Sequence, residues 1–314
     1  MGVMWHSADY LCNASKNGLD FTKTLTIGRS YFQVYGTNFQ HMLRHHGLPG
    51  LPDRPGLDVP MPQYAEFFFK HLGAQSVESL DASGYEGADY ITDLNDPIPD
   101  HLHGRFDLVY DGGSLEHIFN TPQALKNYMS LTREGGSVVI ETMANNTMGH
   151  GFYQFSPEIF FRALSPENGF SIVNIMMFEY FDYSAMYKVS DPSEVKSRIE
   201  LANPSVRIGV IAHARRDRIL PIFAKWPQQS DYSAVWKGEQ DITASSTTPA
   251  QAGLKRRVID RLKRSFPQAV YLKYDLIRKF PAFHRWLNRR RIVKQMSREF
   301  SFEGQPKKYE PVTY

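Results

Sequence analysis

The stretch that decides the fold is Phe106-Asp107-Leu108-Val109-Tyr110-Asp111-Gly112-Gly113-Ser114-Leu115-Glu116-His117-Ile118. Its first five residues are mostly apolar and predict a short strand. The Asp-Gly-Gly that follows predicts a turn, and the last residues predict the start of a helix. Open α/β sheets form their ligand crevices where strands end in such turns. The stretch therefore predicts a small-molecule ligand at the end of this strand.

Strand and helix patterns alternate on both sides of this stretch. Strands are predicted at 24–28, 76–80, 88–92, 106–110, 137–141, 171–180 and 206–212, and helices at 30–43, 63–72, 122–131 and 157–164. The last helix begins with Ser156, a good N-cap, followed by a proline that fits the first helical turn. This alternation predicts an α/β fold with a parallel, doubly wound, Rossmann-like sheet of seven strands.

The sequence divides into a main domain and a basic extension. The predicted parts are a main domain at 1–220 with a Gly- and Pro-rich insertion at 47–62, a linker at 221–253, a basic amphipathic helical arm at 254–298 and a tail at 299–314. From Lys255 to Arg298 there are fifteen Lys and Arg against two Asp, a net charge of +13, whereas the whole chain carries only +3. The main domain is therefore acidic, and the arm predicts an anionic partner.

Composition narrows the class of protein. With 314 residues, of which 42% are hydrophobic, the chain can bury one sizeable core. Its single cysteine, Cys12, excludes an intrachain disulfide, and no stretch approaches the roughly 20 apolar residues of a membrane span. The N-terminus lacks the pattern of a secretory signal. These features predict a cytoplasmic protein, with peripheral attachment to the inner face of a membrane through the arm as a further expectation.

The strand ends carry a series of small and acidic residues in a fixed order. Gly28 follows the first strand, Asp81 the second, Asp93 the third, and the Asp111–His117 segment the fourth. This order resembles the class I S-adenosylmethionine-dependent methyltransferases over about residues 24–212. The family has a glycine-rich turn, two acids and an "LEH" phrase in these places. The resemblance implies S-adenosylmethionine as the cofactor and methyl transfer as the activity.

The resemblance also assigns residues to parts of the cofactor. The implied cofactor-binding residues are Gly28, Ser30, Asp81, Asp93, Leu94, Asp111, Gly112 and Gly113. Gly28 would let the backbone come close to the ligand, Asp81 would bind the ribose hydroxyls, and Asp93 with Leu94 would flank the adenine.

At the methionine end of the cofactor, Asp111 would bind the aminoacyl ammonium and the glycine pair would leave room. The chain departs from the family in the first turn, where only Gly28 matches and Ser30 is merely small. The missing glycines also disfavour a nicotinamide dinucleotide.

The acceptor side is predicted in the loop after the fifth strand, where glycines flank His150. His150 is the first candidate for a base that takes a proton from the methyl acceptor, and His117 is the second. Structural roles remain open for both histidines and for the acids, which also favour turns and helix starts. No metal site is predicted, because His41 and His45 lack the glutamate of the metalloprotease motif.

The arm alternates Lys and Arg with apolar and aromatic residues near helical spacing. The pattern suits amphipathic helices on an anionic membrane surface, but nucleic acid or packing within the protein are alternatives. The sequence thus predicts a methyltransferase acting on an O or N atom of a small molecule or glycan intermediate at a membrane. The alternatives are a non-catalytic, methyltransferase-like binding protein and a nucleic-acid methyltransferase that uses the arm. The oligomeric state is left open.

Overall fold

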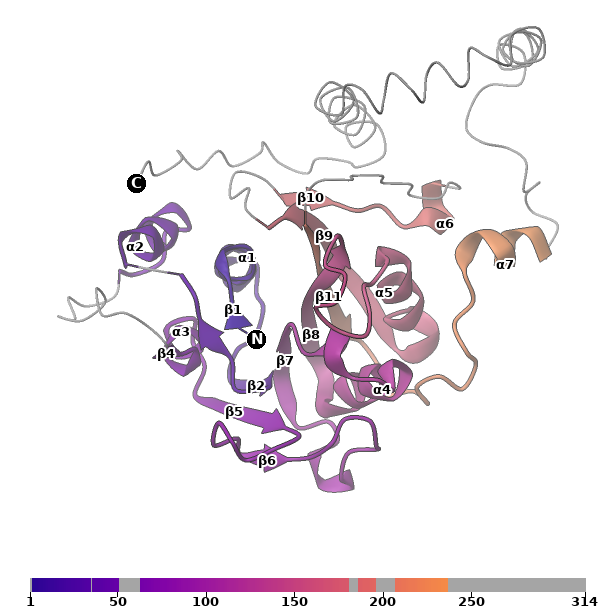
Figure 1. Ribbon diagram of the computed structural model, residues 1–314, viewed down its shortest axis with the longest axis horizontal. Helices are drawn as coiled ribbons and strands as arrows, with labels where there is room; N and C mark the ends of the chain where they lie inside the picture. The colour runs from indigo at the N-terminus through magenta and orange to yellow at the C-terminus, as the bar shows by residue number, and fades with distance from the viewer. Residues whose placement is uncertain (1, 35, 51–62, 181–185, 196–206, 237–314) are drawn as a thin grey trace, which may run out of the picture. The chain divides into compact units, whose positions relative to one another are not determined.

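A computed structural model describes residues 2–34, 36–50, 63–180, 186–195 and 207–236 (Figure 1). The described chain belongs to two compact units. The first holds the described residues up to 189 together with 207–227, and the second holds 190–195 and 228–236. In the second unit, the short helices α6 (Pro192–Val195) and α7 (Ser230–Trp236) contact each other. The basic arm, the tail and most of the insertion lie outside the described residues, so the predictions for them remain predictions.

The first unit contains a sheet of eight strands in the order β10-β9-β11-β8-β7-β2-β5-β6. The strands are β2 (Lys23–Ile27), β5 (Ser76–Asp81), β6 (Tyr90–Ile91), β7 (Phe106–Gly112), β8 (Thr132–Asn145), β9 (Phe170–Glu179), β10 (Met186–Lys188) and β11 (Ile208–Arg216). The five strands β6, β5, β2, β7 and β8 are parallel. Their order is that of the doubly wound sheets, 3-2-1-4-5. The predicted α/β architecture and its seven main strands are confirmed.

The prediction that all strands run parallel is wrong for β11. This strand inserts between β8 and β9 and is antiparallel to both, and β10 is an eighth strand, antiparallel to β9 at the sheet edge. A buried strand has the same apolar pattern in either direction, so the sequence of β11 did not reveal its direction. The described part of the connection after β9 contains the edge strand β10 and the short helix α6.

Helices cover both faces of this sheet (Figure 1). One face packs against α1 (Trp5–Lys16), α2 (Gly36–His45) and α3 (Glu66–His71), in a core that includes Leu108 and Tyr110 of β7. The other face contacts α4 (Thr121–Leu131) and α5 (Pro157–Ala163). The predicted cap of α5 is confirmed, because the Ser156 hydroxyl accepts a hydrogen bond from the Glu158 amide at 3.3 Å. Three 3-10 turns complete the unit: η1 (Asp100–Leu102), η2 (Leu115–His117) and η3 (Pro166–Asn168).

The segment after β2 differs from the prediction of a helix from Ser30 onward. The chain first forms β3 (Tyr31–Phe32), which pairs with β1 (Gly2–Val3) and β4 (Gln63–Tyr64) in a small second sheet. The Ala65 amide donates to the Ser30 carbonyl at 2.8 Å, so the ends of the 31–64 segment meet. The excursion is therefore longer than the predicted insertion at 47–62. The connection between β2 and β5 is completed by α3.

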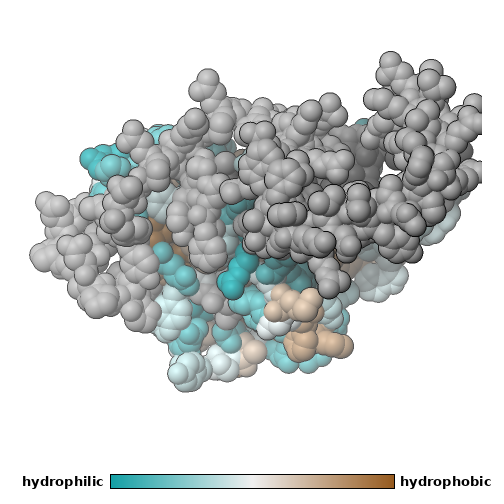
Figure 2. Space-filling model, turned by 45° about the horizontal axis from the view of Figure 1, so that its top comes forward, coloured by the Kyte–Doolittle hydropathy of each residue, from teal (hydrophilic) through white to brown (hydrophobic). Residues whose placement is uncertain are grey.

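No helix among the described residues is both long and apolar enough to cross a membrane. On the face shown in Figure 2, the visible described surface is mostly hydrophilic, with a tan apolar patch at the lower right. Ten large apolar side chains are exposed in the described chain, and two of them, Phe119 and Phe152, pack edge to face with ring centroids 5.7 Å apart.

Candidate functional site

The predicted cofactor residues meet at the carboxyl edge of the parallel strands. Ile27, the last residue of β2, is in register with Leu80 of β5 on one side and Asp111 of β7 on the other. The Gly28 amide donates to the Leu80 carbonyl at 2.7 Å, and Gly28 has a φ of +69°, in the left-handed region that favours glycine. Gly28, Asp81 and Asp111 therefore lie at one edge of the sheet.

At the outer end of this edge, Asp81 offers a half-buried carboxylate. Its Oδ1 accepts a hydrogen bond from the Ser83 amide at 3.0 Å. Asp93 is exposed, and its Oδ1 accepts from the backbone and side-chain nitrogens of Asn95 at 2.9 and 2.8 Å, while Leu94 is buried. Asp81 therefore has the accessibility that a ribose ligand requires, whereas Asp93 also organises the turn after β6.

Arg29 connects the first turn to its surroundings. Its Nε donates to Glu66 at 2.7 Å and its Nη1 donates to the Glu86 carbonyl at 2.9 Å, while the guanidinium stacks on Tyr64 with 3.9 Å to the ring centroid. The neighbouring Ser30 is buried, and its hydroxyl has no hydrogen-bond partner among the described residues. The turn is thus held by the Arg29–Glu66 ion pair, at a place where the family that the sequence resembles has further glycines.

Asp111 is fully buried and its carboxylate is already used by the protein. It accepts hydrogen bonds from the amides of Ser114 (2.6 Å) and Leu115 (3.0 Å) and from the Tyr128 hydroxyl (2.9 Å). Burial and the negative charge of Glu116 raise the pKa of Asp111 to about 7. These contacts correct the expectation that Asp111 binds an aminoacyl ammonium: the residue positions η2 against β7 and α4.

The glycine pair also has a different purpose from the one expected. A Cβ at Gly112 would lie 2.5 Å from the Gly2 carbonyl oxygen, so the N-terminal segment fills the space beside this glycine. Gly113 has a φ of +99°, which the turn requires. The room expected for the methionine moiety at Gly112 is therefore occupied by the backbone of β1.

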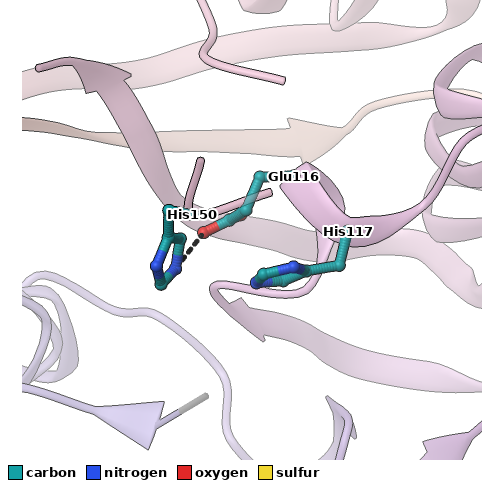
Figure 3. Close-up of side chains that lie close together, drawn as sticks. All are labelled: Glu116, His117 and His150. Carbon is teal, nitrogen blue, oxygen red and sulfur yellow. Dashed lines mark ion pairs between the residues drawn. The ribbon is translucent and has the colours of Figure 1, made fainter. Parts of the chain in front are cut away.

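Three side chains converge beyond this turn (Figure 3). Glu116 and His117 come from η2, and His150 comes from the loop after β8. The Nε2 of His150 lies 3.9 Å from Oε1 of Glu116, and the two imidazole rings have centroids 5.1 Å apart. Glu116 is buried, whereas both histidines are exposed to solvent. The two histidines predicted separately as candidate bases therefore form one cluster around a buried carboxylate.

Backbone contacts hold the His150 loop against η2. The amides of Phe152 and Tyr153 donate to the Glu116 carbonyl at 2.8 and 3.3 Å. This close approach needs Gly151, because a Cβ there would lie 2.6 Å from the Glu116 carbonyl oxygen. The loop is thus fastened at the residue that also supplies the buried carboxylate.

Buried negative charge is concentrated at the ends of β7 and β8. Glu141, in register with Gly112, is buried, and neither of its carboxylate oxygens has a hydrogen-bond partner among the described residues. Burial, together with the charges of Glu116 and Asp111, raises the pKa of Glu141 to about 8. Burial and mutual repulsion therefore disfavour the ionised forms of Asp111 and Glu141.

Comparison with known proteins gives matches only among solved structures. No family profile matches the sequence, and no curated protein matches it significantly. One similar structure is the 1,6-didemethyltoxoflavin-N1-methyltransferase of Burkholderia thailandensis, solved with 1,6-didemethyltoxoflavin and S-adenosylhomocysteine (12% identity, TM-score 0.36, 68% of this chain and 78% of that chain). Another is an S-adenosylmethionine-dependent methyltransferase from Aquifex aeolicus (11% identity, TM-score 0.32, 64% of this chain and 86% of that chain).

The strand order, with β11 antiparallel between β8 and β9, and the acids at the strand ends identify the architecture. The chain has the class I methyltransferase fold. Within this fold, the turn at Gly28, the acid that ends β5 and the "LEH" turn lie at one edge of the sheet.

Sequence reasoning missed three residues at this edge of the sheet: Arg29, Glu116 as a buried partner of His150, and Glu141. The "LEH" phrase pointed to Glu116, but its Oε2 contact with the Thr142 hydroxyl, at 2.6 Å, joins residues 26 positions apart. Glu141 is the last residue of a predicted strand, and a carboxylate at such a position was the available signal.

Proposed function

We propose that this protein transfers a methyl group from S-adenosylmethionine to an O or N atom of a small molecule or glycan intermediate. The observation that carries the proposal is the shared carboxyl edge, where Gly28, with its positive φ, lies next to the accessible carboxylate of Asp81. The similar Burkholderia structure has S-adenosylhomocysteine bound, which supports this choice of cofactor.

The chemistry of the edge fits the cofactor at its adenosine end. Asp81 would accept hydrogen bonds from the ribose hydroxyls, and Leu94 with Asp93 would flank the adenine. Toward β7 the buried carboxylate of Glu116 would suit a positively charged group. When bound, S-adenosylmethionine supplies a methyl group already activated by its sulfonium charge, so the protein has mainly to align the acceptor and exclude water.

The acceptor side of the proposal is the cluster of Glu116, His117 and His150. His150 would take the proton of an acceptor hydroxyl or amine at Nε2, and Glu116 would stabilise the imidazolium that forms, from 3.9 Å. His117 is the second candidate base, and its partial burial lowers its pKa.

Calorimetry with S-adenosylhomocysteine tests the cofactor. We expect binding to the wild-type protein and at least tenfold weaker binding to Asp81→Asn, since a carboxylate accepts two ribose hydroxyl protons and an amide oxygen with its NH₂ does not. Asp100→Asn, at the exposed start of η1, is the matched control and should bind as the wild type does. Equal binding by all three proteins would remove Asp81 from the site, and no heat with any of them would remove the cofactor.

The location of the protein is a separate part of the proposal. The basic arm would hold a cytoplasmic enzyme on the inner face of an anionic membrane through its Lys and Arg side chains and its interleaved aromatic residues. Flotation of the full chain with vesicles containing phosphatidylserine tests this. Binding should fall sharply when Arg289, Arg290 and Arg291 are all replaced by Glu, and unchanged flotation would exclude membrane docking through the arm.

A further inference from the structure

We propose that Glu116, His117 and His150 bind a divalent first-row transition-metal ion, with Zn²⁺ as the best-suited example. The sequence predicted no metal site, because its histidines lack a recognised metal-binding spacing. The structure brings together three side chains from positions up to 34 residues apart in the chain, each offering one ligand atom, and these atoms lie within 4.8 Å of one another.

The three ligand atoms need to move only slightly closer together to coordinate one ion. Ligand atoms around a tetrahedral zinc ion lie about 3.3 Å apart, given metal–ligand distances of about 2.0 to 2.1 Å. The carboxylate of Glu116 is fixed by burial, while the His150 side chain is 48% exposed. Rotation of the two exposed imidazoles therefore suffices to close the site, with no movement of the buried carboxylate.

The buried carboxylate is held as metal-binding side chains are held. One of its oxygens, Oε2, accepts a hydrogen bond from the Thr142 hydroxyl at 2.6 Å, which leaves Oε1 directed toward His150. Hydrogen bonds of this kind orient metal ligands and are a regular part of metal sites. The loop bearing His150 is in turn fastened to the Glu116 carbonyl through Phe152. Both the carboxylate and the loop are thus positioned before any ion binds.

The ligand types select the class of ion. Two imidazoles and one carboxylate suit zinc, iron, cobalt or nickel, whereas magnesium and calcium prefer a shell made wholly of oxygen atoms. Three protein ligands leave at least one coordination position open, as in catalytic zinc sites.

The role of the ion rests on the proposed methyl transfer. A cation here lowers the pKa of an acceptor hydroxyl, just as zinc lowers the pKa of its bound water, so the hydroxyl proton passes to solvent. The acceptor oxygen then forms its bond to the methyl carbon while the carbon–sulfur bond breaks and its electron pair stays on sulfur, leaving a neutral thioether. When the ion is bound, His150 is a metal ligand, and the ion promotes loss of the acceptor proton in place of His150 acting as a free base.

Titration of the full-length, chelator-treated protein with Co²⁺, followed by visible absorption, and with Zn²⁺, followed by calorimetry, tests the site. We expect one equivalent to bind to the wild type and at least tenfold weaker binding to His150→Ala, His117→Ala and Glu116→Gln. Thr142→Val, which removes only the hydrogen bond to the carboxylate, should weaken binding by about 10- to 100-fold. His103→Ala, at an exposed position before β7, is the matched control and should bind as the wild type does.

The proposal is overturned if the wild type binds neither ion with one-to-one stoichiometry, or if His150→Ala and His117→Ala both retain the wild-type affinity. Circular dichroism of each variant must match the wild type, and the two exposed histidine variants keep the test decisive should Glu116→Gln fail to fold. Calorimetry with S-adenosylhomocysteine on the same samples separates the two proposals. Metal binding without cofactor binding refutes the methyl-transfer function alone, and cofactor binding without metal binding refutes the metal site alone.

Discussion

Replacing Gly151 by alanine should detach the His150 loop from η2. The added Cβ would lie 2.6 Å from the Glu116 carbonyl oxygen and 3.1 Å from its carbonyl carbon. Ordinary contact begins about 0.8 Å farther out from the oxygen, so the loop has to move away. The hydrogen bonds that the Phe152 and Tyr153 amides make to this carbonyl are then stretched or lost. At about 1 kcal/mol for each bond, the free energy of unfolding should fall by about 2 kcal/mol.

Gly149 provides a matched control for this experiment, because its constraint is of a different kind. It has a φ of +81°, but a Cβ there would meet no atom within 4 Å. Gly149→Ala should therefore cost about 1 kcal/mol in backbone strain while leaving the loop in contact with η2. The two glycines of one loop thus separate the effect of steric contact from the effect of backbone conformation.

Hydrogen–deuterium exchange of the 147–156 segment, read by mass spectrometry or by NMR, distinguishes the variants. Exchange at the Phe152 amide should be at least tenfold faster in Gly151→Ala than in the wild type, and close to wild type in Gly149→Ala. Urea denaturation gives the accompanying changes in the free energy of unfolding. Unchanged protection of the Phe152 amide in Gly151→Ala would refute the argument that close packing on Glu116 holds His150 in place.

Three further predictions concern buried polar side chains of the described chain. Arg216→Met should lower the free energy of unfolding by about 3 kcal/mol in urea denaturation, because the buried guanidinium donates to the Met129 and Thr132 carbonyls at the end of α4, at 3.0 and 2.6 Å; a loss below 1 kcal/mol would contradict this. Asp9→Asn should lower the free energy of unfolding by about 3 kcal/mol, because Asp9 forms a buried pair with His46 at 2.5 Å between α1 and α2; a double-mutant cycle with His46→Gln should show coupling, and additive losses would exclude it. Burial raises the pKa of Glu141 to about 8, so between about pH 4.5 and pH 8 the folded state holds a proton that the unfolded state has lost. The stability that this group contributes below about pH 4.5 is therefore lost as the pH rises to about 8. Glu141→Gln should flatten this part of the curve of unfolding free energy against pH, and an unchanged curve would show that the carboxylate is not the cause.

The fold could be predicted from the sequence because its signals are local. Apolar runs that end at Gly28, Asp81 and Asp93 mark strand ends, and the same runs place these residues at one edge of a parallel sheet. The sequence did not reveal the direction of every strand or the contacts between residues that are far apart in the chain. The apolar pattern of β11 is the same whether the strand runs parallel or antiparallel to its neighbours.

The N-terminal helix α1 was missed for a related reason. Its buried positions include His6, Ser7 and Asp9, so the helix shows no clear apolar stripe. These polar side chains are accommodated by distant partners, among them His46 for Asp9 and Phe178, on which the His6 ring stacks at 4.1 Å. The buried face of α1 therefore mixes polar residues with apolar ones such as Leu11 and Cys12, and its polar members are explained only by their distant partners.

The sequence predicted at which edge of the sheet the site lies, but it did not predict which side chains contact one another there. Asp111 was placed correctly beside Gly28, yet its role changed because Tyr128 and the η2 amides already bind its carboxylate. His117 and His150 were named as separate candidates, and their convergence on Glu116 depends on a loop closed through Gly151. Such closures join residues far apart in sequence and leave no periodic signal.

The central claim, that the carboxyl edge of β2 and β5 binds an adenosyl cofactor, is tested most directly by a crystal structure of the protein soaked with S-adenosylhomocysteine. The account predicts electron density for the ligand along this edge, with its ribose hydroxyls about 2.7 Å from the Asp81 carboxylate and its adenine beside Leu94. Density for the ligand elsewhere on the molecule, or the absence of ligand density along this edge at saturating ligand, would contradict it.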